Sequence, residues 1–496
     1  MKSLKFVVVL LFVSLKLFGQ SQVDALIHQG MNEAYNFQFD AAEKTFNKIL
    51  EIKPNSPEGY YRISLIHFWI FLGSRDEGEY QVFLKFADLA QQKADKILDK
   101  NKKDYLTKYI SGNLYSFRAM AQATNNKSVD AFWSCKNAVN YYEDVLKQNP
   151  KYYDAYLGLG LFDYAMSFVP DFLKWAVNLT GLSSDKARGF RYIKTAYKKG
   201  ITCKTEAAFH LSKIYTDYLA EYDSAFILLQ DLSSKFPKNA LFNYQYAVSL
   251  IKAKQLDRAL PILDRVIQLN NKRMPQITAL AYYRRGEIYF CKNQFRTAIR
   301  NYKKFLDISK ELDFTGIASL NTALSYKMLG KEEEYKSYLA MAKGGNQDLF
   351  EDAYSYKKSE QFSNNGIDKI YLKLVRMKNY LAAGDNKLVY DSLKSDVNKF
   401  EDSESKAIAR VYLAEAALNL KKYNETVSIS DQISEEKISL EKWVVPMADL
   451  LNAKAKFYLG DKTGTKDHLE DANDENEYDF KDYIQSQIEW LKRRIH

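Results

Sequence analysis

One recurring column of residues constrains the fold of this chain more than any other feature. Gly30, Ala42, Phe46 and Pro54 are separated by 12, 4 and 8 residues. The same spacing of small and aromatic residues returns further along, at Gly286, Ala298, Tyr302 and Phe305. These intervals are typical of a 34-residue unit that folds as a helical hairpin and stacks on its own copies. The column therefore predicts an all-α chain, built as a right-handed superhelical solenoid of such hairpins.

Each position of this unit, which is the tetratricopeptide-like hairpin, has a physical role. Small residues at repeat positions 8 and 20 are expected to face each other where the two helices cross. An aromatic residue or leucine at position 17 is expected to begin the second helix, and proline near position 32 to end it. Matching sets of residues lie within 30–54, 222–237, 247–266, 286–305, 323–342 and 414–433.

Composition and charge exclude several other classes of protein. The chain of 496 residues has only 8 prolines and no stretch of alternating Val, Ile or Thr, so strands are not expected. The formal net charge is +10, but acidic and basic residues are interspersed, which argues against a nucleic-acid partner. Cys135, Cys203 and Cys291 are too far apart for a disulfide framework or a zinc site, and no metal or other cofactor is expected.

The N-terminus has the pattern of an export signal. Lys2 and Lys5 precede an apolar stretch from Phe6 to Leu17, and Gly19 supplies the small residue that cleavage needs. A buried first helix is the alternative, but the first repeat starts at about Val23 without this stretch. No cysteine lies near the cut, which argues against a lipoprotein anchor. We therefore expect residues 1–19 to be a signal peptide, and the protein to reach the periplasm or cell envelope of a Gram-negative, Bacteroidetes-like bacterium.

The mature chain divides into three parts by the regularity of its repeats. Residues 20–200 form an irregular tetratricopeptide-like module, and residues 201–345 form the regular array. Residues 346–496 add further hairpins and end in a capping helix, with soft boundaries near Gly200 and within 343–366. In the capping helix, one face is apolar and the other is basic. The apolar residues are Ile484, Ile488, Leu491 and Ile495.

The irregular module also carries a family resemblance. Its motif runs from a glycine-containing apolar helix to a Ser-x-x-Pro turn and then to a second glycine-containing helix. The residues that carry it are Gly158, Gly160, Phe162, Ser167, Pro170, Gly181, Asp185 and Gly189. This segment resembles the tetratricopeptide repeat 39 family, which includes a yeast protein associated with the mitochondrial outer membrane and the clearance of inclusion bodies. Leu182 and Ser184 depart from the family pattern. The resemblance implies a helical repeat architecture and says little about function.

The first helices of the regular array contain a candidate partner-binding groove. The positions expected on the concave face are Phe242, Tyr244, Tyr283, Glu287 and Phe290. Aromatic rings with one acid could hold an extended peptide or a helix. The alternative is that these rings close a tight superhelix, and both interpretations stay open. Lysine and asparagine, which clamp a carboxylate in repeat grooves that bind chaperone tails, are missing from these positions.

A second candidate is the apolar segment of residues 157–182. Its rings include Phe162, Phe168, Phe172 and Trp175. These could form a pocket for lipid or an apolar small ligand, or touch a membrane surface, although a hairpin that plugs the superhelix is the favoured alternative. The pair Gly158 and Gly160 lies within an apolar helix without a preceding strand, so we interpret it as close helix packing and not as a nucleotide loop.

No catalytic constellation is visible. None of the five histidines lies in a motif with a nucleophile or a metal ligand, and the acidic residues lie on solvated helix faces. The sequence therefore predicts a non-enzymatic protein–protein interaction scaffold of the cell envelope that binds a protein or peptide segment. The alternative is an envelope protein that binds lipid or an apolar ligand through residues 157–182. The identity of the partner and the oligomeric state stay open.

Overall fold

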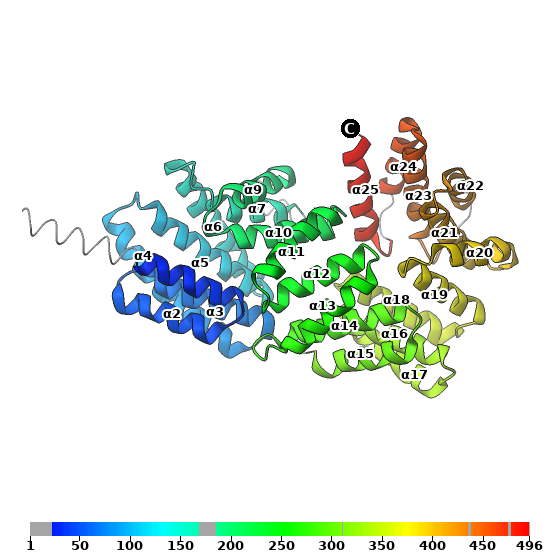
Figure 1. Cartoon of the computed structure of the whole chain (residues 1–496), viewed down its shortest axis with the longest axis horizontal. Helices are drawn as coiled ribbons and strands as arrows, with labels where there is room; N and C mark the ends of the chain where they lie inside the picture. Colours follow the sequence, from blue (N-terminus) through cyan, green and yellow to red (C-terminus); the bar gives the residue numbers. More distant parts are fainter. Residues whose placement is uncertain (1–21, 168–184, 310, 435–437, 475–477, 496) are drawn as a thin grey trace, which may run out of the picture. The chain divides into compact units, whose positions relative to one another are not determined.

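The computed structural model describes residues 22–167, 185–309, 311–434, 438–474 and 478–495, and all the regular elements among them are helices (Figure 1). After a helix over residues 22–35, the helices as far as residue 269 are α2 Phe39–Ile52, α3 Pro57–Ser74, α4 Glu77–Lys100, α5 Tyr105–Thr124, α6 Ser128–Gln148, α7 Ala155–Met166, α9 Lys186–Lys199, α10 Lys204–Asp217, α11 Tyr222–Lys235, α12 Ala240–Lys252 and α13 Leu256–Leu269. The later ones are α14 Pro275–Cys291, α15 Phe295–Ile308, α16 Thr315–Met328, α17 Glu332–Met341, α18 Phe350–Asn365, α19 Lys369–Ala382, α20 Asn386–Asp396, α21 Ser403–Asn419, α22 Tyr423–Ser434, α23 Val444–Leu459, α24 Lys462–Asp474 and α25 Lys481–Ile495. The predicted all-α fold is confirmed.

The repeat positions begin and end the helices as predicted. The position-17 residue is the first residue of the second helix in five hairpins: Phe39, Tyr222, Leu256, Phe295 and Tyr423. Helices α2, α6 and α11 each end two residues before a proline, because proline disfavours helical geometry at the residue that precedes it. Short-range sequence signals therefore determine the hairpin boundaries.

The small residue at position 8 has a different neighbour from the one expected. A Cβ atom on Gly30 would lie 2.3 Å from the ring of Phe46, and one on Gly286 would lie 2.7 Å from the ring of Tyr302. The glycine thus makes room for the aromatic ring at position 24, not for the small residue at position 20. Ala42 at position 20 is fully buried as well.

The chain folds into two compact units. Unit 1 comprises residues 1–211, 231–242 and 271–274, and unit 2 comprises 212–230, 243–270 and 275–496. The main segment of unit 1 ends shortly after the boundary expected near Gly200. Residues 350–365, just after the boundary expected at 345, form α18, which packs on α16 within unit 2.

The later segments of unit 1 pack against its first helices. Asn239 donates from Nδ2 to the carbonyl oxygen of Tyr35 at 2.7 Å, and the ring of Phe236 lies 4.9 Å from that of Tyr35. Arg273 reaches back to Asp40 at 2.6 Å and to Glu79 at 2.7 Å. Segments 231–242 and 271–274 therefore belong to unit 1 through contacts with residues about two hundred positions earlier.

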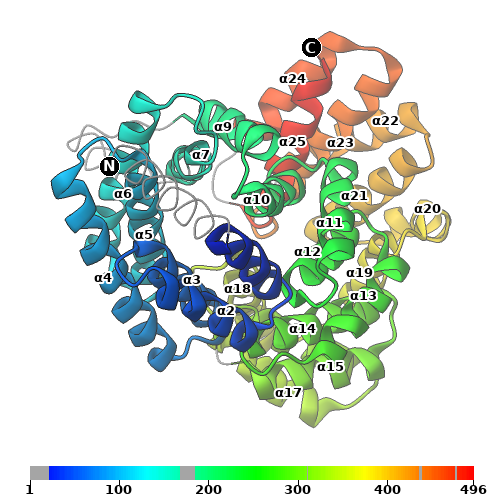
Figure 2. The same ribbon diagram turned by 60° about the vertical axis from the view of Figure 1, so that its left-hand side comes forward.

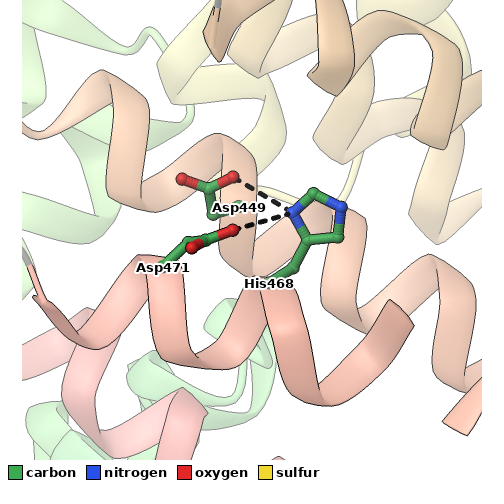
Figure 3. Close-up of side chains that lie close together, drawn as sticks. All are labelled: Asp449, His468 and Asp471. Carbon is green, nitrogen blue, oxygen red and sulfur yellow. Dashed lines mark hydrogen bonds and ion pairs between the residues drawn. The ribbon is translucent and has the colours of Figure 1, made fainter. Parts of the chain in front are cut away.

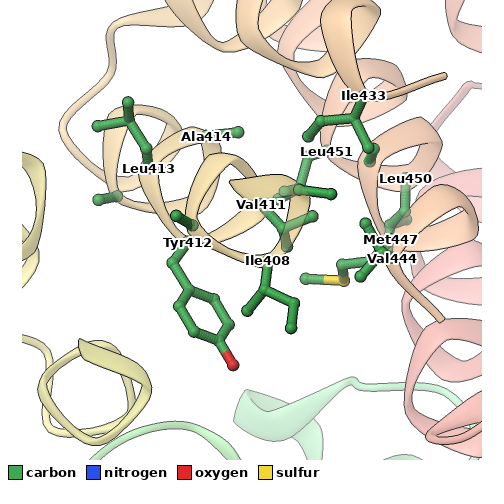
Figure 4. Close-up of a cluster of buried hydrophobic side chains, with 14 of the residues drawn as sticks. Ile408, Val411, Tyr412, Leu413, Ala414, Ile433, Val444, Met447, Leu450 and Leu451 are labelled. Carbon is green, nitrogen blue, oxygen red and sulfur yellow. The ribbon is translucent and has the colours of Figure 1, made fainter. Parts of the chain in front are cut away.

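The core of unit 2 is largest in its C-terminal half (Figure 4). Ile408, Val411 and Leu413 of α21 are buried together with Leu450 and Leu451 of α23. Helix α21 also packs on α23, and Ala414 and Ala448 on these two helices have no exposed surface. Among the residues that the structure describes, none of the helices combines the length and apolar composition that crossing a lipid bilayer requires.

Candidate binding site

The glycines of the irregular module serve helix packing. Helices α7 and α9 lie side by side (Figure 2), and a Cβ atom on Gly189 would come within 2.8 Å of the carbonyl oxygen of Gly160. A Cβ atom on Gly158 would lie 2.1 Å from the ring of Tyr142. The interpretation of Gly158 and Gly160 as close packing is therefore confirmed.

Three aspartates hold this module together. Asp163 is 2 % exposed and accepts two hydrogen bonds from the guanidinium of Arg188, at 2.6 and 2.7 Å. Asp185 caps the N-terminus of α9 by accepting from the backbone N–H of Arg188. Asp154 accepts from three successive backbone N–H groups, those of residues 201–203, at 2.9 to 3.1 Å. The polar residues of the module are thus engaged in structure.

The aromatic residues predicted to line a groove are buried. Phe242, Tyr244, Tyr283 and Phe290 are between 3 and 9 % exposed. Phe242 belongs to unit 1 and the other three to unit 2. Tyr283 packs against the rings of Tyr302, Phe305 and Phe314 at 4.9 to 6.1 Å. This burial supports the alternative that the rings close the superhelix.

Glu287, the one acid of the predicted groove, is partly exposed. It accepts a hydrogen bond from Arg284 at 2.9 Å, one helical turn earlier on α14. Of the apolar-segment residues, Phe162 is partly buried against the cluster around Tyr142 and Val145. Phe168, Phe172 and Trp175 lie outside the described residues, as does the predicted signal peptide.

Unit 2 closes on itself through its last helix. Arg493 of α25 donates to the carbonyl oxygen of Leu219 at 2.7 Å and pairs with Glu221 at 3.1 Å. Arg494 pairs with the same carboxylate at 2.8 Å. These contacts join residues more than 270 positions apart within one unit. We use the name inner face for the side chains of unit 2 that lie around Glu415, which are Lys254, Lys378, Lys454 and Tyr483.

An ion pair between distant parts of the chain lies at this inner face. Lys254, in the turn before α13, pairs with Glu415 of α21 at 2.6 Å across 161 residues of chain. Lys254 lines a pocket of about 470 Å³, together with Gln255, Leu256, Asp257, Arg258, Lys292, Gln294, Ala383 and Asp385. The inner face is therefore bordered by an open pocket.

A buried ion pair joins α18 to the segment before α23. Lys358 of α18 has no exposed surface and pairs with Glu441, which is 4 % exposed. Trp443 donates from its indole N–H to the other oxygen of Glu441 at 2.7 Å. The ammonium of Lys358 also lies 5.5 Å from the ring of Tyr371. Both charges are therefore compensated inside the protein.

Helix α25 has a second face that sequence reasoning missed. Ile484, Ile488 and Leu491 are buried as the amphipathic pattern predicts. Another stripe runs along the same helix at intervals of three or four residues. It consists of Tyr483, Gln487 and Trp490, with Phe480 directly before the helix, and it contacts Lys378 and Lys454 from other helices. The spacing of these residues, at every third or fourth position, could have been recognised in the sequence. The lysines that they contact could not, because they lie on α19 and α23, more than 25 residues away.

Thiol chemistry is not supported by the cysteines. Cys203 is buried and the other two are partly buried, and all three are free thiols. Burial raises the pKa of Cys135 to about 11 and that of Cys291 to about 12. These thiols are protonated at neutral pH and are poor nucleophiles.

One histidine lies between two carboxylates (Figure 3). Nδ1 of His468 is 3.2 Å from Asp449 Oδ1 and 3.8 Å from Asp471 Oδ2. Both carboxylates approach the same ring nitrogen, and that arrangement suits a shared proton. The three side chains are close enough to hold a metal ion, but exposed carboxylates often gather without one.

Comparison with known proteins places the chain in a family. The model of the Iml2/Tetratricopeptide repeat protein 39 family matches residues 80–390, and no curated relative matches the sequence. Among solved structures, the P58(IPK) tetratricopeptide domain is 14 % identical over 95 % of this chain and 97 % of that one, with a TM-score of 0.21. The Cut9–Hcn1 complex is 15 % identical over 96 % and 95 %, with a TM-score of 0.29. The quorum sensor NprR from B. thuringiensis is 13 % identical over 84 % and 98 %, with a TM-score of 0.32. Because its model matches more than half of the residues, the chain belongs to the Iml2/Tetratricopeptide repeat protein 39 family.

Proposed function

We propose that this protein is an exported, non-enzymatic scaffold that binds a segment of another polypeptide on the inner face of unit 2. Helical-repeat solenoids present extended concave surfaces to other proteins, and the family match supports this class of function. The observation that carries the proposal is the closure of unit 2 through Glu221, Arg493 and Arg494. Tyr483 of α25, on the inner face, is 41 % exposed.

The position of Tyr483 gives a direct test. A photo-crosslinking amino acid at Tyr483 is expected to capture a discrete set of proteins from the envelope of the producing bacterium. The same probe at Leu388, which is 42 % exposed on α20, serves as the control. A captured protein is then purified, and its affinity for the unmodified chain is measured by calorimetry. The proposal fails if both probes give the same adducts, or if none of the proteins captured at Tyr483 binds in solution.

Export has a test of its own. N-terminal sequencing of the protein purified from its natural source is expected to start near residue 20, with the protein in the periplasmic or envelope fraction. An intact Met1 and a cytosolic location would overturn this part of the proposal and leave the binding function unaffected.

A further inference from the structure

Two ammonium groups on the inner face of unit 2 have no acidic partner. Lys378 of α19 points at rings, with its Nζ 4.7 Å from the centroid of Phe480 and 5.9 Å from that of Tyr354. Lys454 of α23 donates to Gln487 at 2.7 Å and lies 5.8 Å from the ring of Trp490. Neither lysine forms an ion pair with any residue that the structure describes.

Both amines reach water, and both are destabilised as cations. Lys378 is exposed and Lys454 is half-buried. Burial nevertheless lowers the pKa of Lys378 and lowers that of Lys454 to about 8. Burial disfavours the charged form of an amine, because the cation is poorly hydrated among protein atoms. A bound anion would relieve that cost.

The charges that face these lysines do not neutralise them. Around Lys454 the charged groups are Glu415 of α21 and Lys254, which pair with each other. Around Lys378 they are Glu441 and Lys358, which also pair, together with Glu415 and the protonated thiol of Cys291. With both pairs balanced, no further acid among these groups neutralises the positive charges of Lys378 and Lys454.

The spacing of the two amines indicates the shape of the ligand. The lysines contact Phe480, which directly precedes α25, and Gln487 within it, seven residues later. A helix rises by 1.5 Å per residue, so the two contacted positions are about 10 Å apart along its axis, and this sets the approximate spacing of the amines. An extended chain covers that distance in about three residues. The exposed ring of Tyr483 lies between the two positions, where it can contact the intervening side chains.

From this arrangement we infer that the inner face of unit 2 binds an extended acidic segment of a partner polypeptide, with Lys378 and Lys454 each taking one carboxylate. This inference rests on the proposed scaffold function and specifies the chemistry of its partner. The lysines that the predicted groove positions lack are thus supplied by α19 and α23. Charge complementarity selects the occupant, and the aromatic lining favours a peptide over a small inorganic anion.

Matched peptides test the inference on the full chain. Three blocked octapeptides carry the same neutral dye and differ only at two positions about three residues apart, which hold Glu, Gln or Lys. In fluorescence anisotropy, the Glu peptide is expected to bind at least about tenfold more tightly than the Gln peptide, and the Lys peptide not to bind. Affinity for the Glu peptide is expected to fall steeply with added salt.

Variants locate the site. The pair Lys378→Met and Lys454→Met is expected to weaken binding of the Glu peptide about tenfold or more. The control pair is Lys387→Met and Lys399→Met, whose side chains are 81 and 73 % exposed and pair with acids on or beside α20. It removes the same charge and is expected to leave binding unchanged. Thermal unfolding of both double variants checks that the fold is intact.

The dependence on pH is a second signature. The free Lys454 amine has a pKa of about 8, and a bound carboxylate would raise it, so binding takes up a proton. Affinity for the Glu peptide is therefore expected to fall about tenfold between pH 7 and pH 9 in the wild type, and less in the double variant.

The possible failures are distinct. Equal binding of the Glu and Gln peptides, or full binding by the Lys378 and Lys454 double variant, overturns the acidic-segment inference while the scaffold function stands. The inference is also overturned if none of the peptides binds, or if a single-stranded oligonucleotide binds through these lysines in their place. The scaffold function is judged separately by the partners captured at Tyr483.

Discussion

Tyr142 of α6 illustrates how single residues are chosen in this fold. Its ring approaches glycines of two neighbouring helices, Gly112 of α5 and Gly158 of α7. Its hydroxyl donates to Asn113 at 2.7 Å, and the amide of Asn113 donates to Tyr61 at 3.0 Å. Large aromatic rings are therefore paired with glycines. The sequence shows both kinds of residue, but it does not show which ring contacts which glycine.

The crossing of α7 and α9 gives a prediction at this scale. A Cβ atom on Gly189 would lie 2.7 Å from the backbone nitrogen of Tyr164 and 2.8 Å from the carbonyl oxygen of Gly160, and backbone cannot move aside cheaply. Gly189→Ala is expected to destabilise unit 1 by about 1–3 kcal/mol, measured as a lower thermal unfolding midpoint. Gly344→Ala is the control because no atom lies within 4 Å of its Cβ position. Equal midpoints for the two variants would contradict the packing argument.

His67 of α3 predicts a dependence of stability on pH. Its Nδ1 lies 2.5 Å from Glu79 and its Nε2 lies 3.8 Å from Glu43. Burial disfavours the imidazolium, but the hydrogen bond with Glu79 and the charges of both carboxylates outweigh it and raise the pKa of His67. Attraction to the nearby His67 imidazolium lowers the pKa of Glu43 in turn.

The sign follows from these directions. A raised histidine pKa stabilises the fold below its unfolded value of about 6.5, and that contribution is lost as pH rises through the folded value. The lowered pKa of Glu43 stabilises the fold above the unfolded value of about 4.3, and this contribution to stability is lost as pH falls. The stability difference between wild type and His67→Gln, from urea unfolding, is therefore expected to be largest near pH 5–6 and to shrink toward pH 9. A difference that stays constant across this range would rule out the charged pair.

At the scale of elements, α25 makes contacts that its amphipathic pattern did not predict. The amphipathic pattern correctly predicts a helix whose apolar face covers the preceding hairpin. The basic residues were expected to face water, whereas Arg493 and Arg494 bind Glu221. These two bonds hold the pKa of Glu221 below its usual range. The partner lies in another helical hairpin, beyond the reach of any local pattern.

This contact predicts how firmly α25 is held. Glu221→Gln is expected to loosen the helix by about 1 kcal/mol, which corresponds to roughly fivefold faster hydrogen exchange across residues 481–495. Asp391→Asn removes an exposed pair on α20 and is expected to leave that exchange unchanged. If both variants exchange at the wild-type rate, the closure of unit 2 does not depend on this ion pair.

At the scale of the whole molecule, the two units do not follow simple chain order. Residues 231–242 and 271–274 belong to unit 1 although unit 2 begins at residue 212. A repeat array makes this possible, because each hairpin contacts its neighbours and later hairpins can meet earlier ones after a superhelical turn. Composition and repeat spacing, which suggest boundaries near residues 200 and 345, carry no information about such long-range contacts.

The sequence by itself determined the helical hairpins, their first residues at position 17, their ends before proline and the amphipathic last helix. These depend on interactions within a few turns of chain, where spacing and residue type are sufficient. Only the tertiary structure decided that the predicted groove rings are buried, that Glu221 receives α25 and that Lys378 and Lys454 share an inner face. Those outcomes depend on small rotations accumulated over many helices, and no local pattern specifies their sum.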